Sequence, residues 1–202
     1  MPPPHMQVEL LSRETAFQGY FRVDRYSVRH SLFGGGVSGT VTREVFERGH
    51  AVAVLPYDPV RDEVVLIEQF RVGPYAHGEA PWMIEIVAGI IDLGESAVAV
   101  AERELREEAN LEGIGNFEPM LTCYLSPGGT TETCALFCVR VDTSKAGGVF
   151  GLPGEGEDIR VTTANFTSAM GKLAAGEIRS APAIMALQWL ALNRDSLRHR
   201  WA

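Results

Sequence analysis

Three glutamates that could act together in chemistry lie within five residues of one another, at Glu104, Glu107 and Glu108. Residues 96–109 carry apolar side chains at the spacing of one helical stripe, which predicts a helix over this segment. At 100° per residue the three carboxylates fall within one arc of that helix, with Glu108 closest to the apolar stripe. Carboxylates grouped on one face could bind a cation or transfer protons.

The same glutamates also have a purely structural interpretation. Glu102 is spaced to pair with Arg106, and Arg103 with Glu107, on a solvated helix face. Like charges four residues apart cost an isolated helix only about 0.2–0.5 kcal/mol per pair, so such a cluster is tolerable without any function. The acidic helix alone therefore leaves both interpretations open.

The longer string that contains this helix resembles the signature of the Nudix hydrolases. That signature reads G-x5-E-x7-R-E-U-x-E-E-x-G-U, where U is an apolar residue. Eight of its nine fixed positions are matched, and the remaining glycine is replaced by Asn110, a residue type that also tolerates the left-handed conformation. The matching residues are Gly89, Glu95, Arg103, Glu104, Leu105, Glu107, Glu108 and Leu111.

The resemblance implies a site for divalent metal ions. It would hold about two or three Mg²⁺ ions, with Mn²⁺ as a possible substitute, because both prefer hard oxygen ligands. Glu104 and Glu108 would be the principal ligands. Glu107 would assist them, and the backbone carbonyl of Ala88 would be a further ligand. The residues with a structural role in the motif would be Gly89, Glu95 and Arg103.

Further matches over nearly the whole chain resemble the bacterial ADP-ribose pyrophosphatases of this family. The segment 126–132 follows the signature, and its Pro127 lies 16 residues beyond Leu111 (127 − 111). Taken alone, this segment would be a tight turn. A glycine-rich acidic loop at 146–158 would supply Glu155 as the general base and Glu157 as an outer metal ligand. Taken alone, the loop would be a mobile segment without a role.

The resemblance extends to residues that contact a nucleotide. An aromatic ring would stack on adenine, and arginines would meet ribose or phosphate oxygens, because guanidinium forks suit diphosphates. Each of these residues, taken singly, is more often a packing or surface residue. The residues expected to bind substrate are Tyr20, Phe21, Arg43, Glu44, Arg48, Arg71, Ser126 and Glu132.

The elements around these residues predict an α+β fold. Apolar and β-branched runs predict strands near 8–11, 17–32, 37–46, 51–57, 63–70, 82–87, 119–125, 131–141 and 159–163. Besides the acidic helix, we expect helices near 168–175 and 181–193. The resemblance implies a Nudix α/β/α sandwich with a mixed sheet over 49–202 and a small N-terminal antiparallel β domain over 1–48.

The N-terminal sheet is too small to bury a core of its own. In the enzymes that the chain resembles, this sheet exchanges with that of a neighbouring protomer, so that both chains line each site. We therefore expect a homodimer with exchanged N-terminal regions.

Composition and charge limit the partners. The chain has 202 residues, of which 46% are hydrophobic and 22% are charged, as in ordinary folded proteins. Eighteen basic and twenty-six acidic residues give a net charge of −8, which argues against nucleic acid and anionic membranes as partners. The three cysteines are too few for a disulfide framework. Because no segment has the pattern of a membrane span or an export signal, we expect a cytoplasmic location.

The expected function is Mg²⁺-dependent hydrolysis of ADP-ribose to AMP and ribose 5-phosphate. One alternative is the hydrolysis of another nucleoside diphosphate sugar, such as GDP-mannose. A second is a non-catalytic Nudix-like module that senses ADP-ribose, which the complete set of signature carboxylates disfavours. A third is a structural protein whose acidic helix is only solvated.

Overall fold

The computed structural model describes residues 6–201. The chain forms two compact units, one containing the residues up to His50 together with Tyr124–Thr133, and the other containing Ala51–Cys123 and the residues from Cys134 onward. The segment Tyr124–Thr133 is remote in sequence from the rest of its unit. The expected division after residue 48 remains a prediction, and residues 1–5 of that expected region lie outside the described part of the chain.

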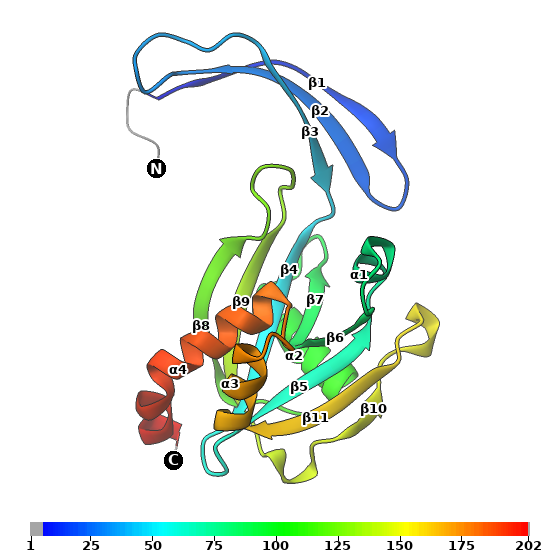
Figure 1. Cartoon of the computed structure of the whole chain (residues 1–202), viewed down its shortest axis with the longest axis vertical. Coiled ribbons are helices and arrows are strands. Elements are labelled where there is room, and N and C mark those ends of the chain that lie inside the picture. Colours follow the sequence, from blue (N-terminus) through cyan, green and yellow to red (C-terminus); the bar gives the residue numbers. More distant parts are fainter. Residues whose placement is uncertain (1–5, 202) are drawn as a thin grey trace. The chain divides into compact units, whose positions relative to one another are not determined.

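The first unit is built on a three-stranded antiparallel sheet in the order β1-β2-β3 (Figure 1). Residues 17–32, expected as one strand, are divided by a turn in which the Gly19 N–H donates to the Phe21 carbonyl at 2.9 Å. Every residue of β1 is exposed, so this sheet buries little apolar surface within its own unit. The strands are β1 (Val8–Gln18), β2 (Arg22–His30) and β3 (Val41–Glu47).

The second unit contains a mixed sheet of eight strands. Its main path is β10-β11-β5-β4-β9-β8, with β6 paired to β5 and β7 paired to β4. The β4–β9 pair is parallel, whereas β5 is antiparallel to β4, β6 and β11. The strands are β4 (His50–Asp58), β5 (Glu63–Phe70), β6 (Trp82–Glu85), β7 (Val87–Ile91), β8 (Ile114–Tyr124), β9 (Thr133–Arg140), β10 (Gly148–Phe150) and β11 (Ile159–Asn165).

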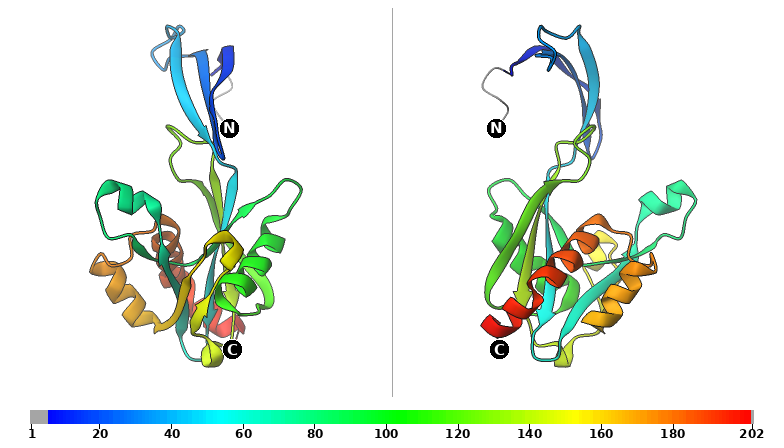
Figure 2. Two further views of the ribbon diagram at one scale, coloured as in Figure 1. Left: turned by 90° about the vertical axis from the view of Figure 1, so that its right-hand side faces the viewer. Right: turned by 60° about the vertical axis from the view of Figure 1, so that its left-hand side comes forward.

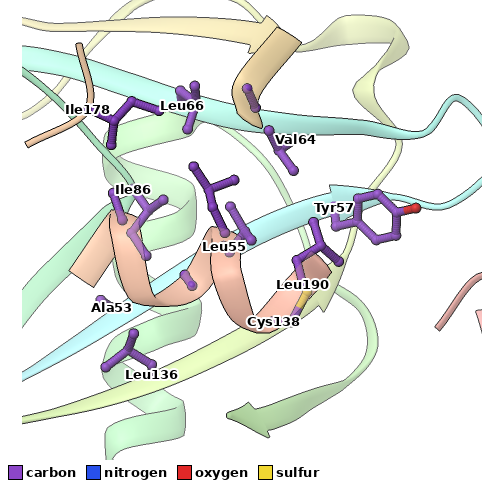
Figure 3. Close-up of a cluster of buried hydrophobic side chains, with 14 of the residues drawn as sticks. Ala53, Leu55, Tyr57, Val64, Leu66, Ile86, Leu136, Cys138, Ile178 and Leu190 are labelled. Atoms are coloured by element: carbon purple, nitrogen blue, oxygen red, sulfur yellow. The ribbon is translucent and has the colours of Figure 1, made fainter. Parts of the chain in front are cut away.

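Helices cover both faces of this sheet, which gives the predicted α/β/α sandwich (Figure 2). The helices are α1 (Val72–His77), α2 (Ala97–Ala109), α3 (Phe166–Ala174) and α4 (Ala181–Trp201), with 3₁₀ turns η1 (Thr143–Lys145) and η2 (Pro153–Glu155). Successive residues of β4 point to opposite layers. Val54 belongs to the same apolar cluster as Leu105 of α2. Leu55 belongs to the cluster on the other face, which contains Leu190 of α4 (Figure 3).

Helix α2 begins and ends at the residues that the sequence indicates. The Ser96 side chain accepts a hydrogen bond from the Ala99 N–H at 3.2 Å and caps the first turn. Asn110 ends the helix in the left-handed conformation, at φ 51° and ψ 40°. The glycine that the signature usually carries here is therefore replaced by a residue that keeps its backbone geometry.

Helix α4 is longer than expected and α1 was not expected at all. Beyond Asn193 the apolar pattern fades, but Leu197 is buried and Arg194 pairs with Asp62, so the helix continues to Trp201. Helix α1 has six residues, none of them buried, and therefore has no apolar stripe that could predict it. Within residues 6–201, no helix is both long enough and apolar enough to cross a membrane.

Candidate active site

The site is centred on two buried glutamates in the last turns of α2. Glu104 is 9% exposed and Glu108 only 2% exposed. The Glu108 carboxylate accepts a hydrogen bond from the backbone N–H of Ala88 at 2.9 Å. Because Ala88 belongs to β7, this contact places the backbone of β7 directly against the acidic face of α2.

Close packing at Gly89 allows this approach. A Cβ atom at position 89 would overlap the Glu104 carboxylate and would lie 2.5 Å from its Cγ. Only a residue without a side chain lets β7 pass over Glu104 in its present position. The glycine of the signature is thus required by the space that Glu104 occupies.

Arg103 connects the acidic residues around the site. Its guanidinium contacts Glu104 at 2.8 Å, Glu107 at 3.3 Å and Glu95 at 3.6 Å. Glu95 in turn accepts a hydrogen bond from the Asp92 N–H at 3.2 Å. One arginine therefore links the loop before α2 to the acidic face of the helix.

The protonation of the buried pair is strongly shifted. Burial raises the pKa of Glu108 to about 8, although the Ala88 N–H and the Arg71 charge oppose the shift. Burial also raises the pKa of Glu104 to about 7, with Arg103 opposing. Neighbouring negative charges add to both shifts, because ionising one carboxylate makes it harder to ionise the next.

The loop glutamates belong to the same electrostatic cluster. The charges of Glu155 and Glu157 both raise the pKa of Glu104. Glu155 is exposed in η2, whereas the Glu157 carboxylate accepts a hydrogen bond from the Leu152 N–H at 3.0 Å. The Gly151 N–H donates to the carbonyl of Glu107 at 3.2 Å, so the base of the loop is attached to α2. The loop at 146–158, which was expected to be mobile, thus contains the short strand β10 and the 3₁₀ turn η2.

Arg71 follows β5 and forms a close ion pair. Its Nε and Nη2 atoms donate to one oxygen of Glu85 on β6, at 3.0 and 2.8 Å. Gln69 donates to the same oxygen at 3.4 Å. Sequence analysis missed Glu85 and Gln69, although each is a polar residue within an apolar strand, and that pattern was the available signal.

The first unit brings together four of the residues expected to bind substrate. The ring centroids of Tyr20 and Phe21 lie 4.8 Å apart in an edge-to-face contact. The central guanidinium carbon of Arg48 lies 5.7 Å from the centroid of the Phe21 ring. Arg48 also pairs with Glu132 at 3.6 Å. Tyr20 is 90% exposed, so one aromatic face is open to solvent.

The other expected substrate residues are engaged elsewhere within their units. Glu44 pairs with Arg25 at 2.9 Å, and Arg43 donates to the carbonyl of Thr42 at 2.8 Å. The Ser126 carbonyl accepts hydrogen bonds from the N–H groups at 129 and 130, which forms a turn. Their role in substrate binding remains a prediction.

The donor set fits a hard divalent cation. Glu104 and Glu108 supply carboxylate oxygens from α2, and the backbone of Ala88 on β7 lies against Glu108. Two ionised carboxylates at such low exposure need nearby positive charge, and the raised pKa values show that the surrounding protein supplies too little. Among residues 6–201, no three His, Cys, Asp or Glu side chains gather closely enough to hold a metal ion alone.

Known proteins are similar to this chain over most of its length. The family model of the NUDIX domain matches residues 47–184. An ADP-ribose pyrophosphatase of Escherichia coli (strain K12) is 47% identical over 195 residues, covering 96% of this chain and 93% of that protein. The ADP-ribose pyrophosphatase of Haemophilus influenzae is 40% identical over 197 residues, covering 96% and 90%.

More distant relatives extend the comparison. A GDP-mannose pyrophosphatase of Escherichia coli is 35% identical over 156 residues, covering 75% of this chain and 78% of that protein. A crystal structure of an ADP compounds hydrolase has a TM-score of 0.70 and covers 96% of both chains at 21% identity, which supports the fold. The family match, the identity over nearly the whole length and the acidic helix lead to one conclusion: this chain belongs to the Nudix family.

Proposed function

We propose that this chain is a Mg²⁺-dependent ADP-ribose pyrophosphatase, which hydrolyses ADP-ribose to AMP and ribose 5-phosphate. The observation that carries the proposal is the buried pair Glu104 and Glu108 against Ala88. Such a pair can bind cations that neutralise a diphosphate. The names of the 47% and 40% identical relatives supply the substrate.

The metal ion would be held by Glu104, Glu108 and the carbonyl of Ala88. Glu107 would assist them, and Glu157 would be an outer ligand. When bound, Mg²⁺ neutralises the diphosphate and polarises water, and Mn²⁺ can replace it. Arg103 keeps the Glu104 carboxylate in place through its 2.8 Å contact. About two or three ions in the working site would match the charge of the glutamates and the diphosphate.

Glu155 is the proposed general base. It accepts a proton from the attacking water, a new oxygen–phosphorus bond forms, and the bridging phosphorus–oxygen bond breaks to release the two monophosphates. Glu155 is exposed and flanked by glycines, and Gly156 has the left-handed φ of 74° that glycine favours. Closure of this loop tip over bound substrate is part of the proposal.

Two substitutions separate metal binding from base catalysis. Glu155→Gln should reduce turnover by about 10²–10⁴-fold while Mg²⁺ still raises the melting temperature. Glu108→Gln should reduce both turnover and the response to Mg²⁺. An unchanged turnover of Glu155→Gln would remove the base assignment, and an unchanged Mg²⁺ response of Glu108→Gln would remove the ligand assignment.

Substrate choice is tested by comparing ADP-ribose with GDP-mannose and diadenosine polyphosphates, with and without Mg²⁺, and by identifying the products. The 35% identical relative makes GDP-mannose the second candidate. If GDP-mannose is turned over as fast as ADP-ribose or faster, GDP-mannose replaces ADP-ribose as the proposed substrate.

A homodimer with exchanged N-terminal regions is part of the proposal. Its support is the apolar surface of the first unit, where Val8, Leu10 and Phe17 are 72%, 57% and 62% exposed. Exposed apolar surface of this kind often forms the interface with a partner protein. Light scattering should give twice the mass of the chain, and a monomer at micromolar concentration would contradict this part of the proposal.

A further inference from the structure

The segment before and within β6 holds Arg71 at both ends. The Arg71 backbone N–H donates to the carbonyl of Pro81 at 2.8 Å. At the other end, Nε and Nη2 donate to one carboxylate oxygen of Glu85. The Glu85 side chain is only 13% exposed, so this ion pair is better shielded from water than an ordinary surface pair.

Gln69 completes the environment of the Glu85 carboxylate. Its amide nitrogen lies 3.4 Å from the same Glu85 oxygen, and the residue is 6% exposed. Glu85 pairs in register with Ile67 of β5, so all three polar groups meet where β5 and β6 run side by side. A carboxylate that accepts three N–H donors has one preferred orientation and transmits it to Arg71.

The position of Arg71 leaves part of its guanidinium available. Two of the five N–H groups of an arginine are used by Glu85, and the Nη1–Nη2 edge is a second fork that suits a phosphate. The side chain is 44% exposed, so a ligand can reach it from solvent.

We propose that Glu85, supported by Gln69, is a positioning residue that holds Arg71 ready for the diphosphate of the substrate. This inference rests on the proposed function for its substrate. Glu85 itself touches neither substrate nor metal. It acts through Arg71, so its effect should disappear once Arg71 is removed.

The proposal predicts an effect on substrate binding. In Glu85→Ala the released Arg71 should raise KM on the order of tenfold, with a smaller change in kcat, because a contact made equally in ground and transition states affects KM. The Mg²⁺ concentration at half-maximal thermal stabilisation should stay that of the wild type, because Glu85 acts through Arg71 and not through the metal ligands. Glu85→Gln, which keeps an acceptor for Arg71, should show an intermediate effect.

The experiment compares Glu85→Ala, Glu85→Gln, Arg71→Ala and the double variant Glu85→Ala/Arg71→Ala in the full chain. Steady-state turnover of ADP-ribose gives KM and kcat, and thermal unfolding over a Mg²⁺ series gives the metal midpoint. Glu68→Ala is the matched control, because it removes a different ion pair of β5, the one between Glu68 and Arg160 of β11. We expect the control to keep the KM and the Mg²⁺ midpoint of the wild type.

Two results would support the proposal together. The double variant should have the KM of Arg71→Ala alone, and every variant should keep the Mg²⁺ midpoint of the wild type. Additive effects on KM, or a raised midpoint in Glu85→Ala, would overturn it. If Glu85→Ala does not fold, Glu85→Gln decides by the same two measurements.

Failure of the proposed function is a separate outcome. If the wild type does not hydrolyse ADP-ribose, the proposed substrate is wrong, and the affinities of the four variants for ADP, measured by titration calorimetry, still decide whether Glu85 positions Arg71 for a diphosphate.

Discussion

In the absence of divalent cations, the free energy of unfolding of this protein should fall as the pH rises from about 5 to about 8.5. Burial raises the pKa of Glu108 from 4.5 to about 8 and that of Glu104 from 4.5 to about 7. Between those values the unfolded chain releases a proton that the folded chain retains. The folded state therefore binds more protons, and its free energy of unfolding falls as the pH increases.

The magnitude follows from the shift at Glu108. The difference 8 − 4.5 is about 3.5, and each pKa unit corresponds to about 1.4 kcal/mol, which gives a loss on the order of 5 kcal/mol above pH 8. Glu104 adds to this loss, but its charge already contributes to the Glu108 shift, so the two losses do not simply add. Asp58 and Asp62 have lowered pKa values, so the stability that they contribute is lost only below about pH 4, outside this range.

The assay is denaturant unfolding of EDTA-treated protein at several pH values, repeated with saturating Mg²⁺. The wild type should lose stability with pH without Mg²⁺, and the stabilisation by Mg²⁺ should grow as the carboxylates ionise. Glu108→Gln should flatten most of the pH dependence. Glu102→Gln, an exposed acid on the same helix, should behave as the wild type. A flat metal-free profile for the wild type, or the same slope in Glu108→Gln, would refute the reasoning.

Three further substitutions test local geometry. Gly89→Ala should move the Glu104 carboxylate and raise the Mg²⁺ concentration at half-maximal stabilisation about 10–100-fold, with an unchanged circular dichroism spectrum. An unchanged midpoint would contradict the crowding between residue 89 and the Glu104 side chain. Asn110→Ala should lower the free energy of unfolding by about 1–2 kcal/mol in denaturant titrations, because φ is 51° there, and equal stability of the variant would argue against that strain. Arg194→Ala should lower it by about 1–3 kcal/mol, because its Nε bonds to Asp62 at 2.7 Å; a loss below about 0.5 kcal/mol would show that the pair is dispensable.

The elements with strong local patterns were predictable from sequence. The strand at Glu63–Phe70 agrees at both ends, and α2 has the cap residues that its sequence indicates. Other elements depend on contacts between distant residues. The last turns of α4 are held by a pair between residues 132 positions apart, Asp62 and Arg194, and no local pattern could reveal it. The short edge strand β10 exists only because it pairs with β11.

The site shows the same division. The signature placed the acidic residues on one helix face, and their spacing alone was enough for that. The burial of Glu108 and its contact with Ala88 could not be read from spacing, because they depend on how closely β7 approaches α2. Glu85 was missed for a related reason. A single glutamate in an apolar strand shows no function until its partner Arg71, 14 residues away, is placed beside it.

The position of the acidic pair along α2 explains which charge the site can accept. Glu104 and Glu108 lie in the last six residues of a 13-residue helix, where the aligned peptide dipoles present negative partial charge. Helix dipole, burial and neighbouring glutamates all disfavour ionised carboxylates there, and a diphosphate would be repelled as well. A bound cation would offset all of these unfavourable terms with its own charge. The apolar layers on both faces of the sheet supply stability that offsets the cost of keeping such a cluster when no cation is bound.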